Sequence, residues 1–351
     1  MYPAIAVADA IRSLDGSAHI VLVGSSDSDA VRLVDRDRYR FETIPAAPLA
    51  RQRTFNRALA ARRIVSGVLA ARRLFTKERV GMVIGFGSYA SGAAVLAARS
   101  LGLVTAVHEA NTMPGMANRL LGRHVHRVYL TVPMREDAWY RRSKACVVGT
   151  PVRREIVALA EIPRHYPEAR PLRVLVIGGT WGARFLAREV PPLLGRVHQR
   201  GTSLEVWHQI GSAPPAPIVR AYADVGVRAR LISRIDEMAE AYRWADFVVA
   251  RSGAGVIAEL ALAGIPALLV PWSEAADDHQ AGNARAFAEA GAGVWVREGD
   301  WSCEHLAERL NGLLGNAEAW QRASAAASSM ARPQAAEALA VDALSLLEGT
   351  R

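Results

Sequence analysis

The sequence predicts an α/β fold in which two similar halves each contain a parallel β-sheet. Short apolar segments alternate with helical segments almost throughout the 351 residues, and glycine-rich turns join several of these pairs. A polar, proline-bearing stretch at residues 156–170 interrupts this alternation, and a second unit then begins abruptly with "LRVLVIGGTWGARFLAREV". We therefore expect two domains, residues 1–155 and 171–326, joined by a linker, with a C-terminal helical stretch at 327–351 that packs back on the first domain.

The composition is typical of a globular protein, with 51% hydrophobic and 22% charged residues. The two cysteines, Cys146 and Cys303, are far apart, which argues against a disulfide framework or a zinc site and fits a reducing cytoplasm. The opening "MYPAIAVADAI" contains Asp9 and lacks the basic start of a signal peptide. The longest apolar run contains Glu259 and Pro266, so it predicts a buried helix followed by a strand rather than a membrane span.

In the first half, the chain begins with a helix whose first turn contains Pro3. Further helices are expected at 91–102 and 115–125. The apolar segments between them predict strands at 18–26, 81–87, 104–110, 127–132 and 145–149.

In the second half, a strand is expected at the start of the unit and a helix directly after its glycine turn. Later strands are predicted at 204–211, 228–233, 246–253, 265–272 and 292–298. Residues 317–347 are alanine-rich and helical on both sides of Pro333. Two such halves predict a ligand site in a cleft at the carboxyl ends of the strands.

The net charge of +9 is concentrated in one segment, residues 51–79. That segment carries nine arginine and lysine residues and a single acid, Glu78, with apolar residues between them at roughly helical spacing. An ordinary solvated surface helix explains the pattern. A peripheral membrane patch explains it too, with apolar side chains among anionic headgroups. Nucleic-acid binding ranks third, because no aromatic platform or known module accompanies the charge.

Two glycine-rich turns of the second half have the pattern of anion-binding sites. "GGTWG" at 178–182 and "RSGAG" at 251–255 each lead into a helix, where backbone N–H groups can approach a phosphate. Purely structural turns also use glycine in this way. Glu259 follows on an otherwise apolar helix, where it is suited to bind vicinal ribose hydroxyls or to interact with the helix dipole.

Polar side chains mark two further candidate positions. Gln280 and Asn283 are three residues apart near a helix start, a spacing that suits sugar hydroxyls, although capping by the preceding aspartates is the alternative. His108, Glu109 and Asn111 directly follow a predicted strand, and three polar residues together favour a site over a purely structural role.

Taken in order, these segments resemble the MurG family of glycosyltransferases, from residue 1 to about 320. The resemblance is carried by "GFGSYASGAAVLAARSLG", "HEANTMPGMANRLL", "GTPVRREI", "VLVIGGTWGAR", "VWHQIG", "IDEMAEAYRWADFVVARSGA" and "DDHQAGNARA". It implies a GT-B fold, with two Rossmann-like domains whose parallel sheets face a central cleft. It also implies an inverting, metal-independent transfer of GlcNAc from UDP-GlcNAc to the C4 hydroxyl of MurNAc in lipid I, which forms lipid II for peptidoglycan.

The resemblance also assigns roles to individual residues, and it implies no cofactor. Asn111 would contact the GlcNAc, Arg153 and Thr180 the diphosphate, and Ile235 the uracil through its backbone. Glu259 would hold the ribose, and Gln280 would hold the sugar. The phosphate would be held by the start of the helix that contains Glu259, at Ala254, Gly255, Val256, Ile257 and Ala258. The partners would be UDP-GlcNAc, an undecaprenyl-linked lipid and, through Arg51–Arg79, the anionic cytoplasmic face of the inner membrane, with no nucleic acid.

The chain departs from the family pattern at several positions. Family members have a strand and a GGTGGH loop before the proline-containing helix, whereas this sequence starts just after that point, so His108 and Glu109 are the remaining candidates for the general base. Other departures are Ala110, Trp181, Arg234 and the segment "AGVIAE". Two alternatives therefore stay open: a related GT-B enzyme with another UDP-sugar or acceptor, and an impaired paralogue that acts as a membrane-associated binding protein.

Overall fold

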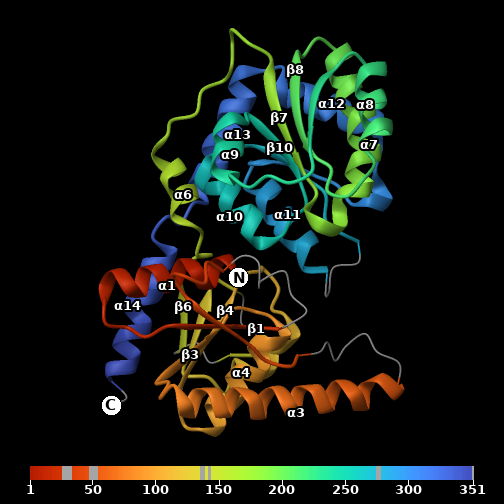
Figure 1. Cartoon of the computed structure of the whole chain (residues 1–351). Helices are drawn as coiled ribbons and strands as arrows, with labels where there is room; N and C mark the ends of the chain where they lie inside the picture. Colours follow the sequence, from red (N-terminus) through yellow and green to blue (C-terminus); the bar gives the residue numbers. More distant parts are fainter. Residues whose placement is uncertain (26–33, 47–53, 135–138, 141–143, 274–277, 350–351) are drawn as a thin grey trace. The chain divides into compact units, whose positions relative to one another are not determined.

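The chain forms two compact units (Figure 1). The computed structural model describes residues 1–25, 34–46, 54–134, 139–140, 144–273 and 278–349, with side chains throughout except at 54–61, 89 and 179–183. Unit 1 comprises Met1–Arg153 together with Gln334–Arg351, and unit 2 comprises Arg154–Pro333. The sequence places the corresponding boundaries at residues 155 and 326.

Unit 1 contains six strands and five helices within the described ranges. The strands are β1 (Val21–Gly24), β2 (Arg40–Thr43), β3 (Met82–Gly85), β4 (Val104–Glu109), β5 (Arg127–Leu130) and β6 (Ala145–Val147). The helices are α1 (Tyr2–Leu14), α3 (Thr54–Lys77), α4 (Tyr89–Ser100), α5 (Met116–Leu121) and α14 (Ala335–Glu348). The sequence does not predict β2, because three of the four residues of its "RFET" are polar; in the structure this strand is only partly buried.

The strands of unit 1 form a parallel pair, β1–β2, and a parallel four-stranded sheet in the order β3-β4-β5-β6. Helices α1 and α14 lie side by side (Figure 1), and they bury Val7 and Leu339 against Ala106 and Tyr129 of the sheet. Helices α3 and α4 form a separate apolar cluster that includes Phe75. Successive strand residues therefore face different helix layers, as expected for a parallel sheet that is covered on both faces.

Within its described residues, unit 2 contains six strands, all parallel, and helices follow most of them. The strands are β7 (Leu172–Ile177), β8 (Leu204–Gln209), β9 (Arg228–Ile232), β10 (Phe247–Ala250), β11 (Ala267–Leu269) and β12 (Gly293–Trp295). The α-helices are α6 (Arg154–Val157), α7 (Gly179–Gln199), α8 (Pro215–Asp224), α9 (Met238–Trp244), α10 (Ala254–Ala263), α11 (His279–Glu289), α12 (Cys303–Leu314) and α13 (Ala317–Ser329). Short 3₁₀ segments occur at η2 (Ala158–Glu161) and η4 (Glu298–Asp300).

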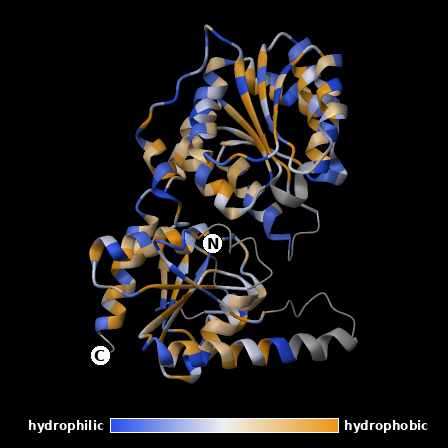
Figure 2. Ribbon diagram, viewed as in Figure 1, coloured by the Kyte–Doolittle hydropathy of each residue, from blue (hydrophilic) through white to orange (hydrophobic). Residues whose placement is uncertain are grey.

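The strand order in unit 2 is β12-β11-β10-β7-β8-β9, so the chain starts in the middle, runs to one edge and returns to the other side. This is the order of a Rossmann-type sheet, in which ligands bind where the strand order reverses, here between β7 and β10. Helices α7, α8 and α12 cover one face and α9 and α10 the other (Figure 1). The strands are strongly apolar (Figure 2). The predicted α/β fold with two Rossmann-like domains is confirmed.

The stretch that the sequence assigns to a linker packs closely on unit 2. Ile156 and Leu159 are fully buried there. The guanidinium group of Arg164 donates hydrogen bonds to the backbone carbonyls of Tyr242, Ala245 and Ala263, at 2.7, 2.9 and 2.9 Å. Burial lowers the pKa of Arg164. One charged side chain thus satisfies carbonyls at the ends of α9 and α10. This explains why the irregular part of the segment, after Glu161, is held in place.

We predict that Arg164→Met lowers the free energy of unfolding of unit 2 by about 1–3 kcal/mol, because three carbonyls lose a charged donor. Urea denaturation followed by tryptophan fluorescence measures this unit, since of the eight tryptophans only Trp139 lies in unit 1. Arg322→Met is the matched control, because the ion pair of Arg322 among the described residues is with the exposed Glu318. Equal stability of the two variants would contradict the role of Arg164.

Candidate functional site

Three strand-to-helix turns of unit 2 meet at one edge of its sheet. The register pairs Ala250 at the end of β10 with Ile177 of β7 and with Leu269 of β11. The turns after β7, β10 and β11 therefore start side by side, at the carboxyl ends of neighbouring strands. Most of the second-half residues that the sequence singles out lie in or after these turns.

The turn after β10 leads into α10 with its first backbone donors uncapped. Gly253 is the N-cap residue, and within the described part of the chain no side chain caps this helix. A Cβ atom added at Gly253 or Gly255 would meet nothing within 4 Å, so the space in front of the helix is open. By contrast, the hydroxyls of Ser88 and Ser302 cap α4 and α12. An uncapped, accessible helix N-terminus favours binding of an anion.

Glu259 lies in the second turn of α10 and is half-buried. Because the first turn of α10 contains no acidic residue, the helix dipole does not account for this carboxylate. Its Oε2 accepts a hydrogen bond from the hydroxyl of Tyr242 on α9, at 2.9 Å. The sequence reasoning missed Tyr242, since no motif or spacing connects a tyrosine of one helix to an acid of the next.

Gln280, in the first turn of α11, is fixed by the two neighbouring turns. Its Oε1 accepts a hydrogen bond from the backbone N–H of Trp272 at 3.0 Å, and its carbonyl accepts one from the Ser252 hydroxyl at 2.8 Å. With its oxygen bound to Trp272, the side-chain amide presents its NH₂ group as a donor.

The second predicted amide, Asn283, has a structural role in the same network. It is 4% exposed, and its Nδ2 donates to the carbonyl of Ser252 at 3.1 Å. The capping alternative is not observed at Asp278, which is the N-cap residue of α11 but makes no capping bond and pairs instead with Arg297. Asp277 lies outside the described residues.

Arg251 is a second residue that the sequence reasoning missed. It is 8% exposed and donates to the carbonyls of Val270 and Pro271, and it forms an ion pair of 2.5 Å with Glu298. Its guanidinium carbon lies 5.6 Å from the centre of the Phe185 ring on α7. Burial lowers the pKa of Arg251, and Glu298 opposes that shift. Arg251 thus connects the turns after β10 and β11 to α7 and η4.

Two other predicted residues flank this edge. Ile235 is half-buried in the loop between β9 and α9, beside an exposed ion pair between Arg234 and Asp236. Thr180 lies in the first turn of α7, whose N-cap residue is Gly178, but its side chain is outside the described part. Its contact with a diphosphate therefore stays a prediction.

The predicted polar cluster of unit 1 comprises the last two residues of β4, His108 and Glu109, and Asn111 in the loop that follows. Glu109 is 2% exposed and accepts hydrogen bonds from the backbone of Asn111 and Gly115 and from the side chains of Asn111 and Asn118, all between 2.8 and 3.0 Å. Through these four bonds it organises the loop that carries Asn111. His108 is also buried, and its Nε2 lies 2.9 Å from the carbonyl of Gly149. Burial lowers the pKa of His108, which favours its neutral form.

Arg153 is the last residue of the first segment of unit 1. Its guanidinium carbon lies 4.1 Å from the centre of the Tyr2 ring at the start of α1. This cation–π contact links the "GTPVRREI" block to the N-terminal helix. The structure thus places Arg153 with His108, Glu109 and Asn111 in unit 1, and the other predicted residues in unit 2.

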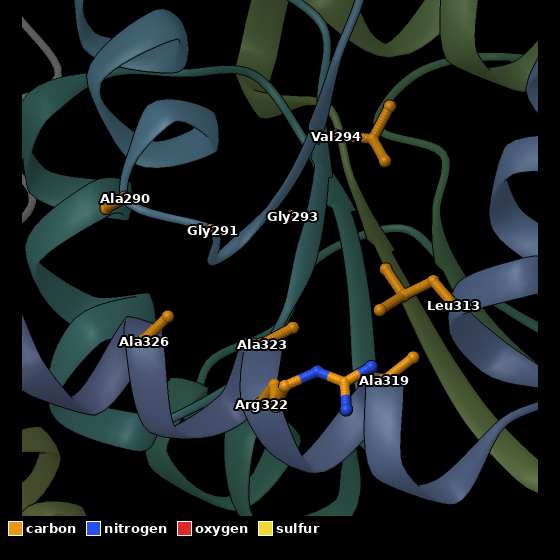
Figure 3. Close-up of a pocket in the computed structure, with 9 residues that line it drawn as sticks. All are labelled: Ala290, Gly291, Gly293, Val294, Leu313, Ala319, Arg322, Ala323 and Ala326. Carbon is orange, nitrogen blue, oxygen red and sulfur yellow. The ribbon is translucent and has the colours of Figure 1, made fainter.

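A separate hollow of about 440 Å³ lies beside β12 in unit 2 (Figure 3). It is open and is lined mainly by glycine, alanine and aliphatic side chains, with Arg322 as the charged residue. None of the predicted site residues lines it. Among the residues that the structure describes, no three His, Cys, Asp or Glu side chains gather closely enough to hold a metal ion.

Family models match both halves of the chain. Residues 1–130 match the glycosyltransferase family 28 N-terminal domain, and residues 173–339 match the glycosyltransferase family 28 C-terminal domain. Together these matches cover most of the sequence.

Individual proteins resemble the chain over nearly its full length. The UDP-N-acetylglucosamine–N-acetylmuramyl-(pentapeptide) pyrophosphoryl-undecaprenol N-acetylglucosamine transferase of Nitratidesulfovibrio vulgaris is 37% identical over 100% of this chain and 95% of its own. The enzyme of the same name from Aeromonas hydrophila is 36% identical over 99% of this chain and 94% of its own. The crystal structure of Acinetobacter baumannii MurG superposes with a TM-score of 0.78 at 27% identity, covering 98% of this chain and 95% of that one. The chain therefore belongs to the MurG family, within glycosyltransferase family 28.

Proposed function

We propose that this protein transfers GlcNAc from UDP-GlcNAc to the C4 hydroxyl of MurNAc in lipid I, with inversion, and so forms lipid II for peptidoglycan. The names of the relatives support this donor and this acceptor. The observation that carries the proposal is the edge of the unit 2 sheet, where an uncapped helix N-terminus, Glu259 and Gln280 follow neighbouring strands. Phosphate, ribose and sugar each have a chemically suited partner there.

The donor would be held in parts. The diphosphate binds the N-terminus of α10, residues 254–258, with further contacts from Thr180 and Arg153. The ribose hydroxyls donate to Glu259, and the uracil bonds to the backbone of Ile235. The NH₂ group of Gln280 donates to a hydroxyl oxygen of the GlcNAc, which Asn111 contacts as well.

The proposed transfer with inversion is a single displacement, which forms no covalent enzyme intermediate. Its main requirement is stabilisation of the leaving group, UDP. In a single displacement, the acceptor oxygen forms a bond to the anomeric carbon while the bond from that carbon to the phosphate oxygen breaks. Negative charge then develops on UDP, and the α10 N–H groups and Arg153 stabilise it in the transition state. The acceptor hydroxyl loses its proton to a general base, for which His108 and Glu109 are the candidates from this chain. Their buried bonds to Gly149 and to the loop of Asn111 make a structural role the competing explanation.

The direct test is a turnover assay with purified protein, UDP-GlcNAc and a lipid I analogue. We expect a GlcNAc-extended product and release of UDP in equal amounts. Turnover only with another UDP-sugar or acceptor would favour a related GT-B enzyme. Binding of UDP without turnover of any of these substrates would favour a binding protein and contradict the proposal.

We predict that Gln280→Glu lowers kcat/KM by about 10–100-fold, while affinity for UDP, which lacks the sugar, changes less than about threefold. A carboxylate cannot donate to the sugar, and its oxygen can still accept the bond from Trp272. Kinetics with UDP-GlcNAc and calorimetry with UDP measure the two effects. The control is Gln321→Glu, because Gln321 is exposed and bonds only the carbonyl of Arg164 among the described contacts. A parallel loss of UDP affinity would argue against a sugar contact.

We also propose that α3 binds an anionic membrane surface, which would place the protein at the cytoplasmic face of the inner membrane. One side of α3 packs on α4 through Ala71 and Phe75. On the other side Val65 and Leu69 are 58% and 50% exposed, and an exposed arginine lies near each end of this pair at Arg62 and Arg73.

These four residues recur every three or four positions, so they share one helix face of mixed apolar and basic character. Figure 2 shows both kinds of residue along the described part of α3. Arg51 and Arg53 lie outside the described residues, and the side chain of Arg57 is not described. No helix in the described ranges is both long and apolar enough to cross a bilayer.

We predict that Leu69→Glu weakens binding to phosphatidylglycerol-containing vesicles by about tenfold, because it removes an inserting side chain and adds a repelled charge. Cosedimentation with vesicles of increasing phosphatidylglycerol content measures the effect. Val219→Glu on α8, which introduces the same charge at an equally exposed apolar residue, should leave binding unchanged. Equal effects of the two substitutions on vesicle binding would contradict the proposal that α3 binds the membrane.

A further inference from the structure

The hydrogen bond between Tyr242 and Glu259 joins two helices that begin at different turns. Tyr242 is fully buried on α9, while Glu259 is half-buried on α10, and their oxygen atoms are 2.9 Å apart. The hydroxyl is the donor, because an ionised carboxylate can only accept. Because the Tyr242 hydroxyl is buried and donates to Glu259, it fixes the position of the Glu259 carboxylate one turn from the open N-terminus of α10.

The position of Tyr242 is itself fixed from outside the site. Arg164 donates to the backbone carbonyl of Tyr242 at 2.7 Å, and it also binds the carbonyls of Ala245 and Ala263, which lie just after α9 and at the end of α10. The tyrosine ring thus projects from a clamped helix end toward Glu259. A glutamate has three rotatable side-chain bonds, and a donor held in this way restricts them before a ligand arrives.

We propose that Tyr242 is the positioning residue that holds the Glu259 carboxylate ready for the two ribose hydroxyls, and that this pair selects ribonucleotides over deoxynucleotides. The inference rests on the proposed binding of ribose by Glu259. Tyr242 acts only through Glu259 and does not contact the ligand. A nucleoside diphosphate that lacks both ribose hydroxyls cannot bond to the oriented carboxylate, so substitution of Tyr242 does not change its affinity.

The experiment compares UDP with 2′,3′-dideoxy-UDP by calorimetry on the full chain, in wild type, Tyr242→Phe and Glu259→Ala. Wild type should bind UDP at least tenfold more tightly than the dideoxy compound, because hydrogen bonds to a charged group are lost. Tyr242→Phe keeps the ring and should weaken UDP about three- to tenfold, while the affinity for dideoxy-UDP changes less than twofold. Tyr166→Phe is the matched control, because it removes a tyrosine hydroxyl bonded to the carbonyl of Leu314 in the same unit. It should change neither affinity.

The outcomes separate this inference from the proposed function. If Tyr242→Phe weakens both ligands by the same factor, or neither, while Glu259→Ala abolishes the preference for UDP, Tyr242 is only structural and the inference is overturned. If wild type shows no preference, or Glu259→Ala keeps it, the ribose assignment of Glu259 fails and the inference fails with it. Thermal melting of each variant identifies a general loss of folding.

Discussion

The candidate donor site depends on one constraint: polar groups at the buried carboxyl edge of the unit 2 sheet must find partners inside the protein. Ser252 meets this need by donating to the carbonyl of Gln280, and Asn283 donates back to the carbonyl of Ser252. Trp272 donates to the Gln280 side chain, while Arg251 satisfies two carbonyls just after β11. These bonds hold the turns after β10 and β11 together, and an unpaired group in their place would cost about 1–3 kcal/mol.

The same network leaves selected groups pointing outward. With glycine at both N-cap positions, 178 and 253, the helices that follow β7 and β10 have no side-chain cap within the described residues, so their backbone donors remain for a ligand. Glu259 and Gln280 are each oriented by a bond from a neighbouring element. A site built in this way is organised before the ligand binds, which is how a protein can stabilise the charge on a leaving diphosphate without rearranging.

The sequence predicted much of this arrangement because the strands of a parallel sheet are continuous apolar runs and their turns are rich in glycine. It singled out the turn at Gly253, Glu259 and Gln280, whose role as a ligand site stays a prediction. The MurG resemblance is confirmed by the family models and relatives. Contacts between separate elements could not be read in this way. No sequence pattern connects Tyr242 or Arg251 to its partners. The segment around Arg164 has the composition of a linker, and its contacts with unit 2 are hydrogen bonds to backbone carbonyls. Every residue has such a carbonyl, so the sequence does not reveal these bonds. Asn283 is three residues from Gln280, and this spacing predicts that the two side chains share one face of a helix. Spacing does not show that a side chain is buried, as that of Asn283 is.

The most direct measurement is a crystal structure of this chain with UDP-GlcNAc. We expect the diphosphate at the N-terminus of α10, both ribose hydroxyls on the Glu259 carboxylate beside Tyr242, and the GlcNAc next to the NH₂ group of Gln280. A nucleotide bound at another edge of unit 2, or a ribose turned away from Glu259, would contradict this expectation.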